Sequence, residues 1–399
     1  MKLEYEKVVL IGPITCDKAE SVGIVNESII NGLGKKYAFV PHIATRGKGM
    51  VRQGHFNAVN IFYFLKHFVV WLACLVRNTP DIAHYAITSH WNLEKSLMLL
   101  RIASLFGAKT VGHLHGGLFL EYFRGLQGWR KKWIFRQLEN LGALVVLSEG
   151  WREAVVREVG LAPTQLFVVN NPLNWEFEQA ALRIPIEKET INVLCFGVID
   201  RKKGVLDILQ AAKLLGVDCQ VNFQLVGTER EPGVFNEIAS IMKAGDLNSK
   251  ISLMGPVFDH AKIKIFREAA VFLLPSYAEN FPLVVLEAAA AGLPIITTRV
   301  GATPEFFEHD VSALFIDTGS PLQIAEAIRS LLNSPARRRE LGLAARQVFT
   351  SRLQREHIMA SMARVYDSVA GRSDSATGKV IAPVGAVRVP TPESPLHES

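Results

Sequence analysis

Short apolar runs alternate with longer amphipathic segments along almost the whole chain, and this alternation restricts the possible folds more than any other feature. The runs are rich in Val, Ile, Leu and Phe, as strands are when both faces of their sheet are buried. Six runs lie in the first half, at 8–13, 38–45, 81–89, 110–116, 143–149 and 166–172. Six more lie in the second half, at 191–198, 221–227, 251–257, 270–276, 294–298 and 312–317. Strands that alternate with helices form parallel sheets covered on both sides, so we predict two doubly wound, Rossmann-like α/β domains.

A polar stretch with two prolines, residues 170–190, separates the two sets of strands. We therefore place an N-terminal domain at 1–175 and a C-terminal domain at 176–350. Strand ends in such sheets open onto a crevice, so two sheets facing each other predict a cleft between the domains. Residues 371–399 are rich in Ser, Pro and Gly without any period, which is typical of a disordered tail.

The charge balance favours anionic partners. The 399 residues include 44 lysines and arginines against 38 aspartates and glutamates, a net charge of +6. Nucleoside diphosphates and an anionic membrane face both fit this excess, whereas no nucleic-acid recognition motif is present. The four cysteines lie far apart with no C-x-x-C pair, and the charged start MKLEYEK is unlike a signal peptide. These features predict reduced thiols and a cytoplasmic protein.

One strongly apolar segment, Ile61 to Val76, has two interpretations. It carries Lys66 and His67 and is too short to span a bilayer, so we expect a buried helix. A helix lying partly in a membrane surface is the alternative.

The stretch SYAENFPLVVLEAAAAGLPI, residues 276–295, places two carboxylates around the start of an apolar helix. Asn280 is expected to cap a helix from Leu283 to Ala291, Pro282 is tolerated in its first turn, and Gly292 ends it. The free amides at residues 279–283 would then point into the crevice, where the helix dipole favours an anion such as a diphosphate. A carboxylate beside that anion suits sugar hydroxyls, so the stretch predicts a site for a sugar attached to a diphosphate. A core helix with one loop acid would give the same periodicity.

The spacing of Glu279 and Glu287, within P-S-x-x-E-x-F-P-L-x-x-L-E-A-x-x-x-G-x-P, resembles the E-x7-E motif of the retaining glycosyltransferases of family 4. The likeness covers residues 8 to 360 and implies the GT-B fold. It implies that Glu287 holds the ribose hydroxyls of a nucleotide sugar and that Glu279 contacts the transferred sugar. Backbone amides near the sugar and diphosphate are implied at Asn280 and Phe281, and Pro282 and Leu283 are expected beside them in the substrate site.

A second motif of this family, G-R-[LIV]-x-x-x-K-G, is only partly kept. The chain has F-G-V-I-D-R-K-K-G at 196–204, with Lys203 in the lysine place and Val198 in the arginine place. The missing arginine removes a bidentate partner of the diphosphate, which a lysine does not replace in geometry. Arg201 or Lys202 could reach in instead, and reduced donor affinity, an altered leaving group and an inactive homologue are the open outcomes.

In the N-terminal half, HLHGG at 113–117 follows a strand. The resemblance places His115 in the cleft near the transferred sugar, and Gly116 permits close backbone approach. It also places Gly12 and Gly23 of the first strand–helix loop near the reaction centre. VGATPEFFE, residues 300–308, is similar to the G-G-x-P-E of the family, where Glu305 has a structural or a functional role.

The resemblance implies a hexosyltransferase-type enzyme that moves a sugar from a nucleoside diphosphate sugar to a glycan or lipid-linked acceptor, in cell-surface polysaccharide or glycolipid synthesis. Lys203 and the helix N-terminus would stabilise the departing charge. No D-x-D-like pair stands at a strand end, so we expect no metal and no cofactor. The last helix, 351–370, should cross back onto the N-terminal domain.

A basic segment with aromatic residues, RGLQGWRKKWIFRQLEN at 124–140, bears on location. It could rest on anionic lipids at the inner face of the cytoplasmic membrane, or be a solvated helix with one buried face.

Two other functions remain open from the sequence. One is a sugar-nucleotide epimerase on the same fold, and the other is a non-catalytic sugar-nucleotide-binding protein, which the Val198 substitution supports. A dehydrogenase is disfavoured because no G-x-G-x-x-G follows a strand.

Overall fold

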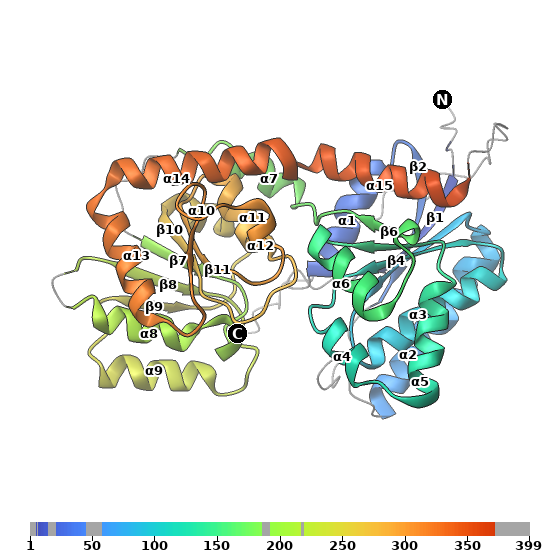
Figure 1. Cartoon of the computed structure of the whole chain (residues 1–399), viewed down its shortest axis with the longest axis horizontal. Helices are drawn as coiled ribbons and strands as arrows, with labels where there is room; N and C mark the ends of the chain where they lie inside the picture. The colour runs from blue at the N-terminus through green and yellow to red at the C-terminus, as the bar shows by residue number, and fades with distance from the viewer. Residues whose placement is uncertain are drawn as a thin grey trace, which may run out of the picture.

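Each half of the chain forms a six-stranded parallel sheet with helices on both faces, as Figure 1 shows. The computed structural model describes residues 5, 7–14, 21–44, 58–185, 192–216 and 219–371. The expected tail at 371–399 lies outside the described residues apart from Gly371. The predicted fold class, with two doubly wound α/β domains, is confirmed.

The N-terminal sheet has the strand order β2-β1-β3-β4-β5-β6. Its strands are β1 Lys7–Ile14, β2 Tyr37–Ile43, β3 Ile82–Ile87, β4 Lys109–Leu114, β5 Ala143–Val146 and β6 Leu166–Val168. Its helices are α1 Ser21–Leu33, α2 Ala58–Asn78, α3 Trp91–Leu105, α4 Phe119–Gly125, α5 Gly128–Glu139 and α6 Glu149–Val159. The strand order reverses between β1 and β3, which is where ligands bind in sheets of this kind.

The C-terminal sheet has the order β12-β11-β10-β7-β8-β9, so its reversal lies between β7 and β10. Its strands are β7 Asn192–Phe196, β8 Asn222–Val226, β9 Ile251–Met254, β10 Ala269–Leu274, β11 Ile295–Thr298 and β12 Leu314–Ile316. Its helices are α7 Trp175–Ala181, α8 Val205–Leu214, α9 Val234–Ala244, α10 Asp259–Glu268, α11 Leu283–Ala290, α12 Thr303–Phe306, α13 Pro321–Asn333 and α14 Pro335–Val348.

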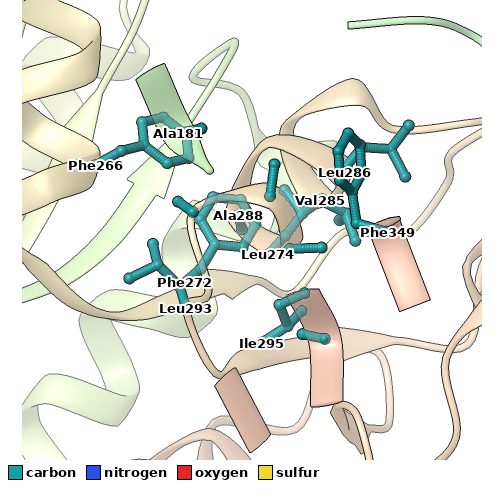
Figure 2. Packing of buried hydrophobic residues seen from close by; sticks show 14 of the residues in the cluster. Ala181, Phe266, Phe272, Leu274, Val285, Leu286, Ala288, Leu293, Ile295 and Phe349 are labelled. Carbon is teal, nitrogen blue, oxygen red and sulfur yellow. The ribbon is translucent and has the colours of Figure 1, made fainter. Parts of the chain in front are cut away.

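Apart from Glu287, helix α11 is apolar on all sides, and its residues from Val285 onward are buried. Figure 2 shows Val285, Leu286 and Ala288 among side chains of β10, β11 and the segment after α14. Gly292, with φ 67°, ends the helix as predicted. This packing fixes the start of α11 beside the end of β10.

The last helix, α15 (Arg355–Ala370), packs on the N-terminal domain. Figure 1 shows it lying along that domain after α14 has passed along the C-terminal one. The Tyr37 hydroxyl donates to Asp367 at 2.7 Å, and Lys36 pairs with the same carboxylate at 2.9 Å. The C-terminal end of the described chain is therefore part of the N-terminal core.

The prediction that Ile61 to Val76 is a buried helix is wrong in one respect. The segment is helical, but only Trp71 and Leu75 of its large side chains are fully buried, whereas Phe62, Leu65 and Val69 face solvent. The sheet covers one side of α2 and nothing among the described residues covers the other side. The apolar composition therefore reflects two apolar faces, of which one is packed.

Candidate active site

The strand reversal of the C-terminal sheet brings Lys203 and Glu279 together. Glu279 follows β10, and Lys203 ends a single 3₁₀ turn, Arg201–Lys203, that begins at Asp200 after β7. The Asp200 carboxylate accepts a hydrogen bond from the Lys203 amide at 2.9 Å and fixes this turn. Lys203 Nζ lies 2.5 Å from Glu279 Oε1, with both side chains largely buried. This ion pair places a cation and an anion at the point where the fold favours ligands.

The two loops that carry this pair touch through Gly204. Gly204 has φ 74°, and a Cβ there would lie 2.2 Å from the Pro275 carbonyl oxygen. Only glycine permits this approach. A hollow beside the loops is lined by Phe196, Gly197, Val198 and Lys203. Glycine at 204 is thus needed for the geometry of the ion pair.

The start of α11 is left open by the protein. Pro282 is the N-cap residue, and no side chain caps the helix. The prediction that Asn280 caps it is wrong, because the helix begins three residues after Asn280 and its side chain turns elsewhere. The first amides of the helix, at Leu283 and Val284, lack acceptors within it and carry its positive dipole end. An anion next to Lys203 would meet these amides.

Glu287, in the second turn of α11, is a buried carboxylate with a lysine partner that the sequence motifs do not include. Lys262 of α10 lies 2.6 Å from Glu287 Oε1, and its ammonium also lies 4.9 Å from the ring centres of Phe177 and Phe196. Burial raises the pKa of Glu287, and the nearby Lys262 charge opposes that rise. Glu287 Oε2 is buried and has no hydrogen-bond partner among the described residues. One oxygen of the carboxylate is thus held, and the other is free to accept a hydroxyl.

Arg201 does not take the place of the missing arginine at Val198. Its guanidinium pairs with Glu231 and Glu237 instead. Val198 itself lines the hollow beside Lys203. In this structure Lys203 is therefore the one basic side chain of the 201–203 turn directed at Glu279.

The N-terminal contribution comes from His115, at the carboxyl end of β4. Its backbone oxygen accepts a hydrogen bond from the Asn280 side chain at 2.9 Å, so the carboxyl ends of the two sheets meet here. The His115 Nε2 atom is buried without a partner among the described residues. Burial lowers the pKa of His115 to about 4, so the imidazole is neutral at pH 7. A neutral imidazole can donate or accept one hydrogen bond toward a ligand.

Behind His115 lies a buried row of polar rings that sequence reasoning missed. The ring centres of His113 and His115 are 4.1 Å apart, His84 Nε2 lies 3.2 Å from His113 Nδ1, and the Tyr366 hydroxyl lies 2.6 Å from His84 Nδ1. The strand register places His84 and His113 on one face of the sheet. The alternation of H-x-H at 113–115 was the available signal, but the contribution from α15 could not be read from spacing. The row links the last helix to the ring at the domain junction.

The three predicted glycines differ in their surroundings, since Gly12 and Gly116 have close neighbours and Gly23 lies in a helix. Gly12 lies at the end of β1, where a Cβ would lie 2.9 Å from His42 Cβ and from the Tyr85 ring. A Cβ at Gly116 would lie 2.8 Å from the Thr88 carbonyl carbon. Gly23, by contrast, lies in the first turn of α1 rather than in the preceding loop, because helix α1 begins at Ser21.

Glu305 forms a second bridge between the domains. Its two carboxylate oxygens accept hydrogen bonds from the Glu149 and Gly150 amides, at 3.0 and 3.1 Å. These are the first amides of α6, so Glu305 of α12 occupies the N-terminus of a helix in the other domain. A structural role therefore accounts for this residue.

Comparison with known proteins identifies the domain that holds the Lys203–Glu279 and Lys262–Glu287 pairs. Residues 177–348 match the family model described as glycosyl transferases group 1. This segment is a glycosyl transferases group 1 domain. The match supports the E-x7-E resemblance, and the group 1 domain coincides with the C-terminal sheet and its helices.

Curated relatives match part of the chain. The chain is 30% identical over 163 residues to a D-inositol 3-phosphate glycosyltransferase of Pseudarthrobacter chlorophenolicus, which covers 40% of the chain and 39% of that relative. It is 26% identical over 256 residues to an alpha-maltose-1-phosphate synthase of Mycolicibacterium smegmatis, covering 59% of the chain and 66% of the relative. The chain thus spans about two fifths of the length of the first of these relatives.

Solved structures extend the likeness to both domains at the level of fold. The sucrose-phosphate synthase of Thermosynechococcus elongatus has a TM-score of 0.71 at 19% identity and covers 90% of this chain and 98% of its own. The Anabaena protein HepE, solved with UDP-glucose, has a TM-score of 0.69 at 14% identity and covers 91% and 100%. The two-domain architecture is thus the GT-B fold of glycosyltransferases.

Proposed function

We propose that this chain is a retaining glycosyltransferase that moves a sugar from a nucleoside diphosphate sugar to a glycan or lipid-linked acceptor. The observation that carries the proposal is the Lys203–Glu279 ion pair beside the uncapped start of α11, at the strand reversal of a group 1 domain. The site thus combines the Lys203 cation, the free amides at the start of α11 and the Glu279 carboxylate, which can accept hydrogen bonds from hydroxyls.

The donor fits this site in one orientation. The diphosphate would lie on the α11 amides and attract Lys203 away from Glu279, because a diphosphate carries more charge than a carboxylate. Glu279 is then free to accept hydroxyls of the transferred sugar, and Glu287 Oε2 is free for a ribose hydroxyl. HepE, a structural neighbour, was solved with UDP-glucose, which supports a nucleotide sugar as donor.

The chemistry needs stabilisation of the leaving diphosphate as the acceptor hydroxyl arrives on the same face of the sugar. Lys203 and the helix dipole supply that stabilisation without a metal in this proposal. The leaving phosphate oxygen takes the proton of the acceptor hydroxyl, so no strongly basic side chain is required. Neutral His115 is placed to hydrogen bond to the sugar or to the acceptor rather than to remove a proton, since its pKa is lowered to about 4.

We further propose that the protein acts in the cytoplasm, on the inner face of the cytoplasmic membrane, in the synthesis of a cell-surface polysaccharide or glycolipid. The basic helix α5 supports this location. It buries Ile134 and Leu138 and leaves Lys132 and Arg136 exposed.

A second function, non-catalytic binding of a sugar nucleotide, is favoured by one observation. Val198 stands where the motif has arginine, and Arg201 pairs with glutamates instead of replacing it. Lower donor affinity or the loss of turnover would follow.

Calorimetric titration with uridine, guanosine and thymidine diphosphate sugars tests the proposal. Wild type should bind one donor, and Glu287→Gln should weaken that binding at least tenfold while thermal unfolding shows that the variant is folded. Glu326→Gln, an exposed glutamate of α13, is the matched control and should bind as wild type does. Failure of the folded wild type to bind every donor would contradict the proposal. Binding without transfer would favour the non-catalytic protein, and turnover of the donor sugar without any acceptor would indicate an epimerase.

A further inference from the structure

Helix α2 exposes a continuous apolar stripe on the outer surface of the N-terminal domain. The exposed fraction is 64% for Phe62, 54% for Leu65 and 63% for both Val69 and Val76. Their spacing of three, four and seven residues keeps these side chains on one face of the helix. We call these four residues the α2 stripe.

Helix α2 is packed against its domain, so the α2 stripe does not belong to a detached helix. The opposite face of α2 buries Trp71 and Leu75, and the Trp71 indole donates to the Leu99 carbonyl at 3.0 Å. The residues Asn60–Asn78 are long and apolar enough to cross a bilayer, and 17% of that window is buried. Spanning would require the loss of the Trp71 contacts, so the helix can meet lipid only with its outer face.

The charge around the α2 stripe is positive. Residues 58–139 contain ten lysines and arginines and four aspartates and glutamates. Helix α2 has Lys66 and Arg77 beside the stripe and no acidic residue. Helix α3 packs against both α2 and α5, so the exposed Lys132 and Arg136 belong to the same helical layer. The region thus combines apolar side chains with cations for which the described part of the chain shows no acidic partner.

The apolar side chains and the cations together distinguish between two possible partners, a second copy of this chain and a lipid bilayer. In a symmetric contact between two copies of this chain, the Lys66 and Arg77 side chains of both copies would come together without an acidic partner, which is unfavourable. A membrane with anionic headgroups instead accepts the stripe at the acyl boundary and the cations at the phosphates. We propose that the α2 stripe is a docking surface for an anionic lipid bilayer.

Docking through α2 also orients the molecule. In a parallel strand–helix–strand unit each helix begins at the carboxyl edge of the sheet, which is the edge that carries His115. Phe62, in the second turn of α2, is therefore on the side of the domain nearer this edge. If the chain is the proposed transferase, the bilayer would face the side from which a lipid-linked acceptor arrives, whereas docking itself does not depend on that activity.

Vesicle flotation of the full chain tests the docking surface without any enzyme assay. The wild type should float with vesicles of phosphatidylcholine and phosphatidylglycerol and remain at the bottom with pure phosphatidylcholine. The triple variant Phe62→Gln, Leu65→Gln, Val69→Gln should lose at least tenfold in the floated fraction. A matched control replaces three exposed leucines of the C-terminal domain, Leu214→Gln, Leu322→Gln and Leu343→Gln, and should float as wild type does.

Further measurements keep the result interpretable. Lys132→Glu with Arg136→Glu should weaken flotation and reduce its salt dependence. Donor titration with the α2 variant shows whether the other domain is intact. The proposal is overturned if wild type ignores anionic vesicles, or if the folded α2 variant floats normally. A concentration-dependent dimer in light scattering that the α2 variant abolishes, without lipid binding, would identify a second copy as the partner instead.

Discussion

The two domains share an architecture and differ in how they treat buried polar groups. At the carboxyl edge of the C-terminal sheet each functional carboxylate has a lysine, with Lys203 on Glu279 and Lys262 on Glu287. At the corresponding edge of the N-terminal sheet the polar groups are histidines, and His115 has no charged partner among the residues that the structure describes. One edge is therefore built from paired charges and the other from neutral imidazoles.

This difference fits a donor site in the C-terminal domain and an acceptor site in the N-terminal domain. A donor with a charged diphosphate needs charge at its site, and paired charges can exchange partners when the ligand arrives. An uncharged acceptor hydroxyl needs hydrogen-bonding groups without net charge, which a buried histidine provides because desolvation keeps it neutral. The pH dependence of stability should therefore have opposite signs for the buried groups of the two domains.

The largest expected effect is acid unfolding of the N-terminal domain. Burial lowers the pKa of His42 to about 4, of His84 to about 3 and of His115 to about 4, all below the usual value near 6.5. The unfolded chain takes up these protons first, so stability is fully present above pH 6.5 and is lost as the pH falls toward 4. Each imidazole contributes up to about 1.4 kcal/mol per pH unit in that window.

Tryptophan fluorescence during urea unfolding measures this loss, because the sequence has no tryptophan between 176 and 350. His42→Gln should make the pH dependence shallower, and the exposed His260→Gln should not. The C-terminal domain carries an opposite contribution from Glu178, where burial raises the pKa to about 7. That contribution favours folding below pH 4.5 and is lost as the pH rises through 7. A His42→Gln variant whose free energy of unfolding depends on pH as steeply as that of the wild type would contradict the comparison.

The second expected effect is on turnover. Lys203→Ala removes the cation beside the α11 amides, so kcat should fall by about 10²- to 10³-fold, or roughly 3–4 kcal/mol of transition-state stabilisation. Lys202→Ala is the matched control, since the Lys202 side chain is exposed and lies one residue away. Steady-state transfer assays with the donor found by calorimetry provide the measurement. Similar losses in both variants would show that Lys203 has no special position.

A smaller effect is expected for Lys262→Met. Without its lysine the buried Glu287 carboxylate has a still higher pKa, so donor affinity at pH 7 should fall by about tenfold or more, on the order of 1–3 kcal/mol. Affinity should recover as the pH rises, because the ionised carboxylate accepts hydroxyls. Lys264→Met, on the exposed side of the same helix, is the control. A drop in affinity that does not change with pH would point to lost packing instead.

The smallest effect is expected at the bridge between the domains. Glu305→Gln weakens two exposed hydrogen bonds to the start of α6, at a cost of about 1 kcal/mol or less. Amide exchange at Glu149 and Gly150 should accelerate several-fold, whereas Glu308→Gln should leave it unchanged. Unchanged exchange in Glu305→Gln would show that the bridge does not hold the domains together.

Much of the fold followed from local pattern. Continuous apolar runs between helical segments are sufficient to predict parallel sheets, and the expected runs 8–13 and 294–298 lie at β1 and β11. The E-x7-E stretch also placed Glu279 in a loop and Glu287 in a helix. The errors arose where a side chain had a distant alternative, as Asn280 did when it bonded to His115 instead of capping α11.

The sequence by itself determined the strand–helix alternation, the presence of two domains, and the positions of Glu279 in the loop before a helix and of Glu287 within that helix. These features depend on residues close together in the chain. Only the tertiary structure decided their partners. Lys262 reaches Glu287 across 25 residues, and Tyr366 reaches His84 across 282, and neither pair has a local signal. The exposure of α2 was decided in the same way. Composition gives the apolar area of a helix, whereas the number of its faces that are covered depends on which elements fold back against it.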